Sequence, residues 1–237
     1  MQLIREHWNK NDIADFQKYL LSYSKGTEKG AWEKGIINTS LPCIAVPSPI
    51  VKSFVKEIHK GNFVEFIDLW IWENWTDTSI IGQLICKIPN FDEQKKYLDV
   101  YVGKIDNWAS CDLIKLKITE KNKAQYWALA QEYINSKKTF TRRAGLRILF
   151  QFIDDENYLP QIFKTLDRLN GEKEYYVNMI CAWILAECFT KQREKTLAYL
   201  KNNKLNDFVI NKGIQKCRDS FRISAQDKDM LLSYKRK

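Results

Sequence analysis

The residues of this chain best suited to chemistry are Trp108 and Asp112, within residues 105–112 (IDNWASCD). The pattern predicts a helix start with Asp106 or Asn107 as N-cap, which places Trp108 and Asp112 on one helix face. An aromatic ring beside a carboxylate can hold an electron-poor ligand or place an acid where positive charge develops. In the alternative interpretation, Trp108 packs inward and Asp112 interacts favourably with the helix dipole in the first turn.

A second candidate is the pair Arg142 and Arg143, which follows Thr139 and Thr141. If either threonine caps a helix, the two arginines fall in or near its first turn, where the helix dipole disfavours cations by roughly 0.3–1 kcal/mol each. A phosphate at the helix N-terminus would explain their presence, because it accepts from both the guanidinium groups and the free N–H groups. The alternative is a salt bridge to an acid on the neighbouring helical hairpin.

The segment 174–189 is apolar on nearly all sides, a pattern typical of a buried helix. It predicts that Trp183 belongs to the core and that Asn178 needs a hydrogen-bond partner. Further along, Lys212 and Lys216 fall on one side of a basic amphipathic helix. They can contact phosphates, or they can form a solvated charged face.

The sequence lacks the motifs that metal sites, phosphate-binding loops and covalent catalysis require. The six cysteines include no C-x-x-C pair, and the two histidines, His7 and His59, lie far apart, so no zinc cluster is expected. There is no Gly-rich phosphate loop, serine nucleophile elbow or H-E-x-x-H motif. We therefore expect no metal and no cofactor, and any catalysis would depend on carboxylates and aromatic faces.

Composition places the chain among soluble proteins. Its 237 residues are 45% hydrophobic and 28% charged, no apolar run suits a membrane span, and scattered cysteines fit a reducing cytoplasm. The net charge of +9 is uneven, because residues from 191 onward hold thirteen Lys and Arg against five Asp and Glu. This asymmetry suggests an anionic partner such as nucleic acid, although a solvated lysine-rich surface has the same composition.

Hydrophobic periodicity predicts helices along most of the chain. Residues 2–23 read as one or two helices capped near Asn11-Asp12, and residues 24–35 as a loop or short helical insert. Ser48-Pro49 starts the next helix, and Gly61-Asn62 separates it from one that includes Phe63 to Ile71. Further helices are expected near 78–89, 92–102, 106–118, 121–134, 139–153, 155–169, 173–189, 191–202, 205–220 and 224–235, and the basic end 235–237 as a frayed tail.

Taken in pairs, these helices form hairpins, and the first helix of each hairpin starts near residue 49, 78, 106, 139, 173 or 205. Steps of this length are typical of helical-hairpin repeats, and no strand-like alternation of four or more residues competes. We expect an all-α fold, an α-solenoid of about six HEAT-like antiparallel hairpins with a concave basic face. It would form a single domain over 1–237, with 1–45 as a helical cap or extension and 46–237 as the repeat core.

With these residues in order on a helical-repeat chain, the sequence resembles the AlkD-like DNA alkylation repair family. The resemblance runs from about Val46 to Lys237. Its most specific points are Trp108 with Asp112, Arg143 before Ala144-Gly145-Leu146, and Trp183 in Ala182-Trp183-Ile184-Leu185. The family consists of HEAT-like solenoids and includes glycosylases that remove cationic N3- and N7-alkylpurines.

The resemblance implies roles for the matching residues. Asp112 would stabilise the oxocarbenium ion and position water, Trp108 and Trp183 would contact the deoxyribose of the lesion, and Arg143, with Arg142, would hold the DNA backbone. The expected partner is alkylated or distorted double-stranded DNA, bound by a monomer without metal or membrane.

The chain departs from the characterised glycosylases next to Trp108. They carry a Trp-Trp-Asp run where this chain has Asn107-Trp108-Ala109, and Met179 stands where a polar residue is expected. Fold transfers between relatives more safely than activity. Two alternatives to the glycosylase therefore stay open: a non-catalytic binder of damaged or branched DNA, and a helical-repeat scaffold for a protein partner.

Overall fold

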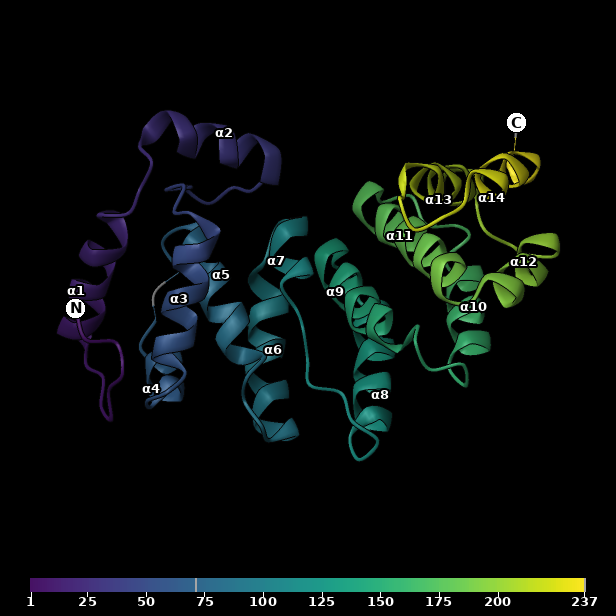
Figure 1. Cartoon of the computed structure of the whole chain (residues 1–237). Coiled ribbons are helices and arrows are strands. Elements are labelled where there is room, and N and C mark those ends of the chain that lie inside the picture. The colour runs from purple at the N-terminus through teal and green to yellow at the C-terminus, as the bar shows by residue number, and fades with distance from the viewer. Residues whose placement is uncertain (71, 237) are drawn as a thin grey trace. The chain divides into compact units, whose positions relative to one another are not determined.

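The computed structural model describes residues 1–70 and 72–236, and every regular element within them is a helix (Figure 1). The prediction of an all-α fold is confirmed. Ile71 and Lys237, which the sequence-based predictions included, lie outside the described residues. The chain divides into two compact units, Met1–Gln125 and Tyr126–Lys237. None of the helices described is long and apolar enough to cross a membrane.

The first unit is built around α5. Its helices are α1 (Lys10–Leu21), α2 (Thr27–Ile37), α3 (Ser48–Ile58), α4 (Phe63–Asp68), α5 (Trp75–Ile85), α6 (Phe91–Lys104) and α7 (Trp108–Asp112). Helix α5 packs against α3, α4, α6 and α7. Next to them Phe16 of α1 is completely buried and meets the rings of Phe54, Phe66 and Trp70 edge-on. Such aromatic packing supplies a large part of the apolar burial that stabilises the unit.

The second unit is built around α11. Its elements are α8 (Lys123–Ile134, whose first residues fall in the first unit), α9 (Thr139–Leu149), η1 (Phe150–Phe152), α10 (Leu159–Arg168), α11 (Tyr175–Lys191), α12 (Arg193–Lys201), α13 (Asp207–Asp219), α14 (Ala225–Met230) and η2 (Leu231–Tyr234). Helix α11 packs against α9, α12 and α13, and Figure 1 shows α11 and α13 in green and yellow. Most of the side chains of α11 are buried, as its all-round apolar pattern predicts.

Alternate helices pack side by side within each unit. In the first unit α5 contacts both α3 and α7, and in the second α11 contacts both α9 and α13. These six helices begin at residues 48, 75, 108, 139, 175 and 207, each within three residues of a predicted hairpin start. The observed helix starts are therefore close to the predicted ones, and the contacts join alternate helices within a unit.

Several predicted helix starts are displaced by capping. Helix α1 is capped by Asn9, whose side chain accepts from the backbone N–H of Asp12, while Asp12 accepts in return from the N–H of Asn9. Asn74 and Asp77 form the same reciprocal box at α5, which therefore begins before residue 78. Each helix starts where an Asn and an Asp three residues later satisfy the free N–H groups. Residues 24–35, expected as a loop or short insert, fall largely within the full helix α2.

The helix expected over 106–118 is much shorter. Helix α7 ends at Asp112, and no regular helix is described from 114 to 118. There Ile114 and Leu116 are buried while Lys115 and Lys117 are exposed, the alternation of an extended chain. The expectation that no such alternation competes with the helices was wrong at this segment.

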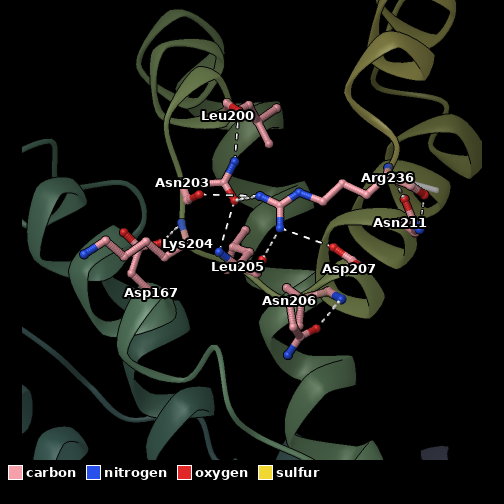
Figure 2. A network of polar contacts seen from close by, with 10 residues as sticks. Asp167, Leu200, Asn203, Lys204, Leu205, Asn206, Asp207, Asn211 and Arg236 are labelled. Carbon is pink, nitrogen blue, oxygen red and sulfur yellow. Dashed lines mark hydrogen bonds and ion pairs between the residues drawn. The ribbon is translucent and has the colours of Figure 1, made fainter.

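Arg236 is held in place by several contacts, which corrects the expectation of a frayed tail at this residue. Figure 2 shows Arg236 among residues of the α12–α13 connection. Its guanidinium donates to the carbonyl of Leu205 and to the side chain of Asn203, and it pairs with Asp207. The side chain of Asn211 bonds to both the backbone N–H and carbonyl of Arg236. Arg236 thus satisfies carbonyl groups of a neighbouring loop instead of facing solvent alone.

Gly145 on α9 lies against α8 so closely that a side chain cannot fit. A Cβ there would come within 2.7 Å of both the Ala130 carbonyl oxygen and the Ile134 backbone nitrogen. We predict that Gly145→Ala lowers the free energy of unfolding by about 1–3 kcal/mol, because two helix backbones must separate.

The matched control is Gly35→Ala in α2, where a Cβ would meet nothing within 4 Å. It should raise stability by about 0.5–1 kcal/mol, since alanine is the better helix former. Urea unfolding of both variants checks the pair, and an unchanged Gly145→Ala variant would contradict the close packing.

Candidate functional site

Helix α7 carries Trp108 and Asp112 and is only five residues long. Its N-cap is Asn107, one of the two predicted capping residues, whose buried side chain accepts from the backbone N–H of Ser110 at 2.8 Å. A helix of this length is unstable alone, because the nucleation cost is not recovered over so few residues. Its position must therefore come from tertiary contacts.

The carboxylate of Asp106 ties the start of α7 to the chain that follows α2. It accepts from the Thr39 hydroxyl and from the backbone N–H and hydroxyl of Ser40, each at 2.6 Å. Burial opposes ionisation of this carboxyl, but the hydrogen bonds from Ser40, Thr39 and Asn107 outweigh it and lower the pKa of Asp106. The carboxylate is thus an anchor joining segments far apart in sequence.

Trp108 makes a second connection to the same region. Its indole N–H donates to the backbone carbonyl of Ile36, at the end of α2, over 3.1 Å. One turn earlier on α2, the Trp32 side chain is 66% exposed, and Ile36 itself is 50% exposed. Residues 1–45, whose role the sequence left open, thus supply the groups that orient Trp108.

A third contact reaches α7 from α6. The phenol of Tyr101 is completely buried and donates to the carbonyl of Ser110 at 3.0 Å. Cys111 is also fully buried, whereas Trp108 and Asp112 are half-buried. Helix α7 therefore turns its middle residues into the core and leaves the predicted aromatic and acid, one turn apart, partly accessible.

In the second unit, Arg142 binds an acid from the start of α11. Its guanidinium meets the carboxylate of Glu172 through two bonds of 2.9 and 3.2 Å, and donates to the carbonyls of Ser136 and Lys137. Both side chains of this ion pair are largely buried. The salt bridge considered as an alternative to a phosphate is therefore present at Arg142.

Arg143 lies deeper than a phosphate ligand on an open surface would. Its side chain is among the buried polar groups, 5% exposed, and it donates to the carbonyl of Tyr176 in the first turn of α11 at 2.7 Å. Neither Thr139 nor Thr141 caps α9, whose N-cap position is Lys138. The two arginines thus link α9 to the beginning of α11, and their contact with DNA stays a prediction.

Trp183 is half-buried, although its helix is apolar on nearly all sides. Its ring lies 4.6 Å from that of Phe150, and the guanidinium of Arg147 lies over Phe150 at 5.2 Å from the ring centre. Phe150 and Arg147 were missed at the sequence level. The available signal was spacing, because Arg143 and Arg147 of α9 and Phe150 directly after it follow one another at i, i+4 and i+7.

Lys212 and Lys216 lie on α13, exposed and half-buried respectively. The opposite face of α13 is buried, and a Cβ on Gly213 would come within 2.7 Å of the Leu185 side chain on α11. Asn178 of α11 finds the required partners, since it donates to the Glu172 carbonyl and accepts from Asn206, the N-cap of α13. The α11–α13 packing therefore directs both lysines away from the core.

Thiol and metal chemistry have little support. None of the six cysteines forms a disulfide, and burial raises the pKa of Cys43 to about 11 and of Cys181 and Cys217 to about 12. Such thiols stay protonated and unreactive at neutral pH. Within residues 1–70 and 72–236, His, Cys, Asp and Glu form no group that could hold a metal ion. Among the acids, Asp77 is buried with a pKa raised to about 7 by that burial, and it belongs to the α5 cap.

The Asp106 anchor gives a pH-dependent prediction. Asp106→Asn should lower the free energy of unfolding by about 2 kcal/mol at neutral pH, because bonds to a charged acceptor are lost. Since the folded pKa is lowered, this stabilisation is present above the unfolded pKa of about 3.9 and disappears as pH falls through the folded pKa.

Urea unfolding at neutral and acid pH measures the difference between wild type and variant. Asp15→Asn is the control, because Asp15 forms a solvent-exposed pair with Lys18 that contributes little. If the difference in free energy of unfolding between wild type and Asp106→Asn persists unchanged in acid, the ionised carboxylate of Asp106 is not the anchor.

Comparison with known proteins supplies the family. No curated protein matches the chain. The family model described as DNA alkylation repair enzyme matches residues 1–217, which include both candidate regions and end just after Lys216. This match covers most of the chain and agrees with the resemblance carried by Trp108, Asp112, Arg143 and Trp183. The chain belongs to the DNA alkylation repair enzyme family.

Proposed function

We propose that this protein is a DNA glycosylase that hydrolyses the N-glycosidic bond of cationic N3- and N7-alkylpurines in double-stranded DNA. The observation that carries the proposal is α7, where tertiary contacts hold a half-buried indole and a carboxylate one turn apart. Membership in a DNA alkylation repair family supplies the class of substrate.

The chemistry suits a site with few reactive groups. An alkylated purine carries positive charge and is already a good leaving group, so no general acid is needed to protonate it. As the bond to the base breaks, positive charge develops on the deoxyribose. A carboxylate at Asp112 stabilises that charge and orients the attacking water, which is electrostatic catalysis without a metal.

Trp108 contributes an aromatic face beside the acid. A ring of this kind attracts a cation through its quadrupole, by about 0.5–2 kcal/mol depending on desolvation. Its N–H bond to the Ile36 carbonyl limits rotation of the indole, so the face is already oriented before DNA arrives. Trp183, backed by Phe150, is proposed as a second aromatic side chain that contacts the DNA.

DNA binding requires phosphate contacts, and we propose cations of the second unit for this role. Lys212 and Lys216 are the proposed contacts on α13. Arg143 and Arg142 are proposed at the start of α9, where phosphate must compete with the Tyr176 carbonyl and with Glu172. The lysines are therefore the more accessible pair.

We predict that Asp112→Asn reduces release of 7-methylguanine from methylated duplex DNA by at least about 10²-fold, because the developing cation loses its counter-charge. Affinity for the same DNA should change little. Asp99→Asn is the matched control, an exposed acid of α6 that pairs with Lys95. Release of 7-methylguanine by the variant at the wild-type rate would rule out the assigned role, and no release by the wild type would refute the glycosylase.

One observation favours a second candidate, a non-catalytic reader of damaged or branched DNA. The characterised glycosylases carry a second tryptophan at the position of Asn107, and here that side chain is buried as the α7 cap. Helix α7 thus presents a single aromatic. A reader needs the phosphate contacts and a preference for distorted duplex, but no catalytic acid.

Both candidate functions depend on Lys212 and Lys216 of α13. The salt dependence of DNA binding measures how much these lysines contribute. We predict that replacing Lys212 and Lys216 together by Gln reduces the slope of log K against log salt by about 2, because each lysine that binds a phosphate accounts for about one unit of slope. Lys195→Gln is the control, because Lys195 already pairs with Glu156. An unchanged slope in the double variant would show that phosphates bind elsewhere.

A further inference from the structure

Phe221 is the most exposed large hydrophobic side chain in the described part of the second unit. Its relative exposure is 103%, and it lies in the short connection between α13 and α14. Burial of a phenylalanine ring is favourable, and this side chain forgoes that stabilisation in the isolated protein. A partner that covers the ring would recover that energy.

The backbone that carries Phe221 is anchored on both sides. Before it, the backbone N–H of Ser220 donates to the Cys217 carbonyl at 3.2 Å. After it, Arg222 forms two bonds of 2.9 and 2.6 Å with the carboxylate of Glu187, a largely buried residue of α11. Ile223 is then buried again. The loop therefore presents the ring from a fixed position, so little backbone freedom is lost when it binds.

The chain segment that leads to Phe221 is rich in basic residues. Residues 211–221 contain Lys212, Lys216 and Arg218 and one acid, Asp219, giving a net charge of +2. Asp219 accepts from Gln215 at 2.8 Å, and Arg218 is exposed. An isolated ring among cations suits an anionic partner with flat apolar faces.

The area that one phenylalanine ring can bury distinguishes a protein partner from a nucleic-acid partner. One aromatic ring buries about 150–250 Å², far below the roughly 1,600 Å² of a specific protein interface. It is, however, sufficient to enter a single base step, because apolar wedges act on DNA as individual side chains beside phosphate-binding cations. Nucleic acid is therefore the better match.

We propose that Phe221 is a wedge that enters the DNA stack at an unstacked or distorted step while neighbouring cations contact the phosphates. This inference rests on the proposed DNA-binding function and extends it to a segment beyond residue 217, where the family match ends. The wedge gives the protein a preference for DNA whose bases are already partly unstacked, since less stacking energy must be lost there.

The test compares the full-length wild type with Phe221→Ala on two short duplexes, one regular and one with a central mismatch. We expect Phe221→Ala to lose about tenfold in affinity for the mismatched duplex, the magnitude of one aromatic–base stack, and to keep its affinity for the regular duplex. Phe221→Trp should retain the preference. Thermal unfolding should not change, because the ring is fully exposed.

Leu232→Ala, which removes another exposed apolar side chain of the same unit, should behave as the wild type. If wild type and Phe221→Ala discriminate equally between the duplexes, the wedge is refuted while DNA binding stands. Self-association of the wild type that Phe221→Ala abolishes, with DNA affinity unchanged, would show a protein contact and also refute it. If the wild type binds neither duplex at low salt, the proposed function fails with it.

Discussion

The candidate site in the first unit depends on the carboxylate of Asp106. Helix α7 is too short to persist by itself, and Asp106 fastens its start to Thr39 and Ser40. The bonds from Trp108 to Ile36 and from Tyr101 to Ser110 complete the attachment. A carboxylate with several hydrogen-bond donors is stable as an anion even when partly buried, which makes it a suitable anchor. The geometry of Trp108 and Asp112 is a consequence of these contacts.

Polar contacts have the same role in the second unit. The pair Arg142–Glu172 joins the start of α9 to the start of α11, and Asn178 with Asn206 joins α11 to α13. Removing one partner of a buried ion pair leaves a charge unsatisfied, at a cost of about 3–5 kcal/mol. These contacts set which helix ends lie together, whereas apolar packing around α11 sets how closely the helices approach. Trp183 is supported by Phe150 within this frame.

The positive charge of the C-terminal segment is partly neutralised by folding. Lys191, Arg193, Lys195, Arg222 and Arg236 each form an ion pair with an acid. The excess of Lys and Arg over Asp and Glu therefore overstates how many cations are available to a phosphate. Exposed cations such as Lys212 and Arg218 are the ones that can attract an anionic partner.

Sequence alone was sufficient for the helical class, for the approximate starts of α3, α5, α7, α9, α11 and α13, and for narrowing the cap of α7 to Asp106 or Asn107. These features depend on local periodicity and on side chains that reach three residues along the chain. It was insufficient for the end of α7, for the Glu172 partner of Arg142, and for the contacts of Arg236.

The contacts of Arg142 and Arg236 depend on residues far away in the sequence, and local patterns carry no record of them. The same holds for the candidate site. The spacing of Trp108 and Asp112 determined that they share a helix face, but only the tertiary contacts of residues 36–40 and Tyr101 decided that the face stays accessible. A five-residue helix has no orientation of its own, so the fold around it determines what it presents.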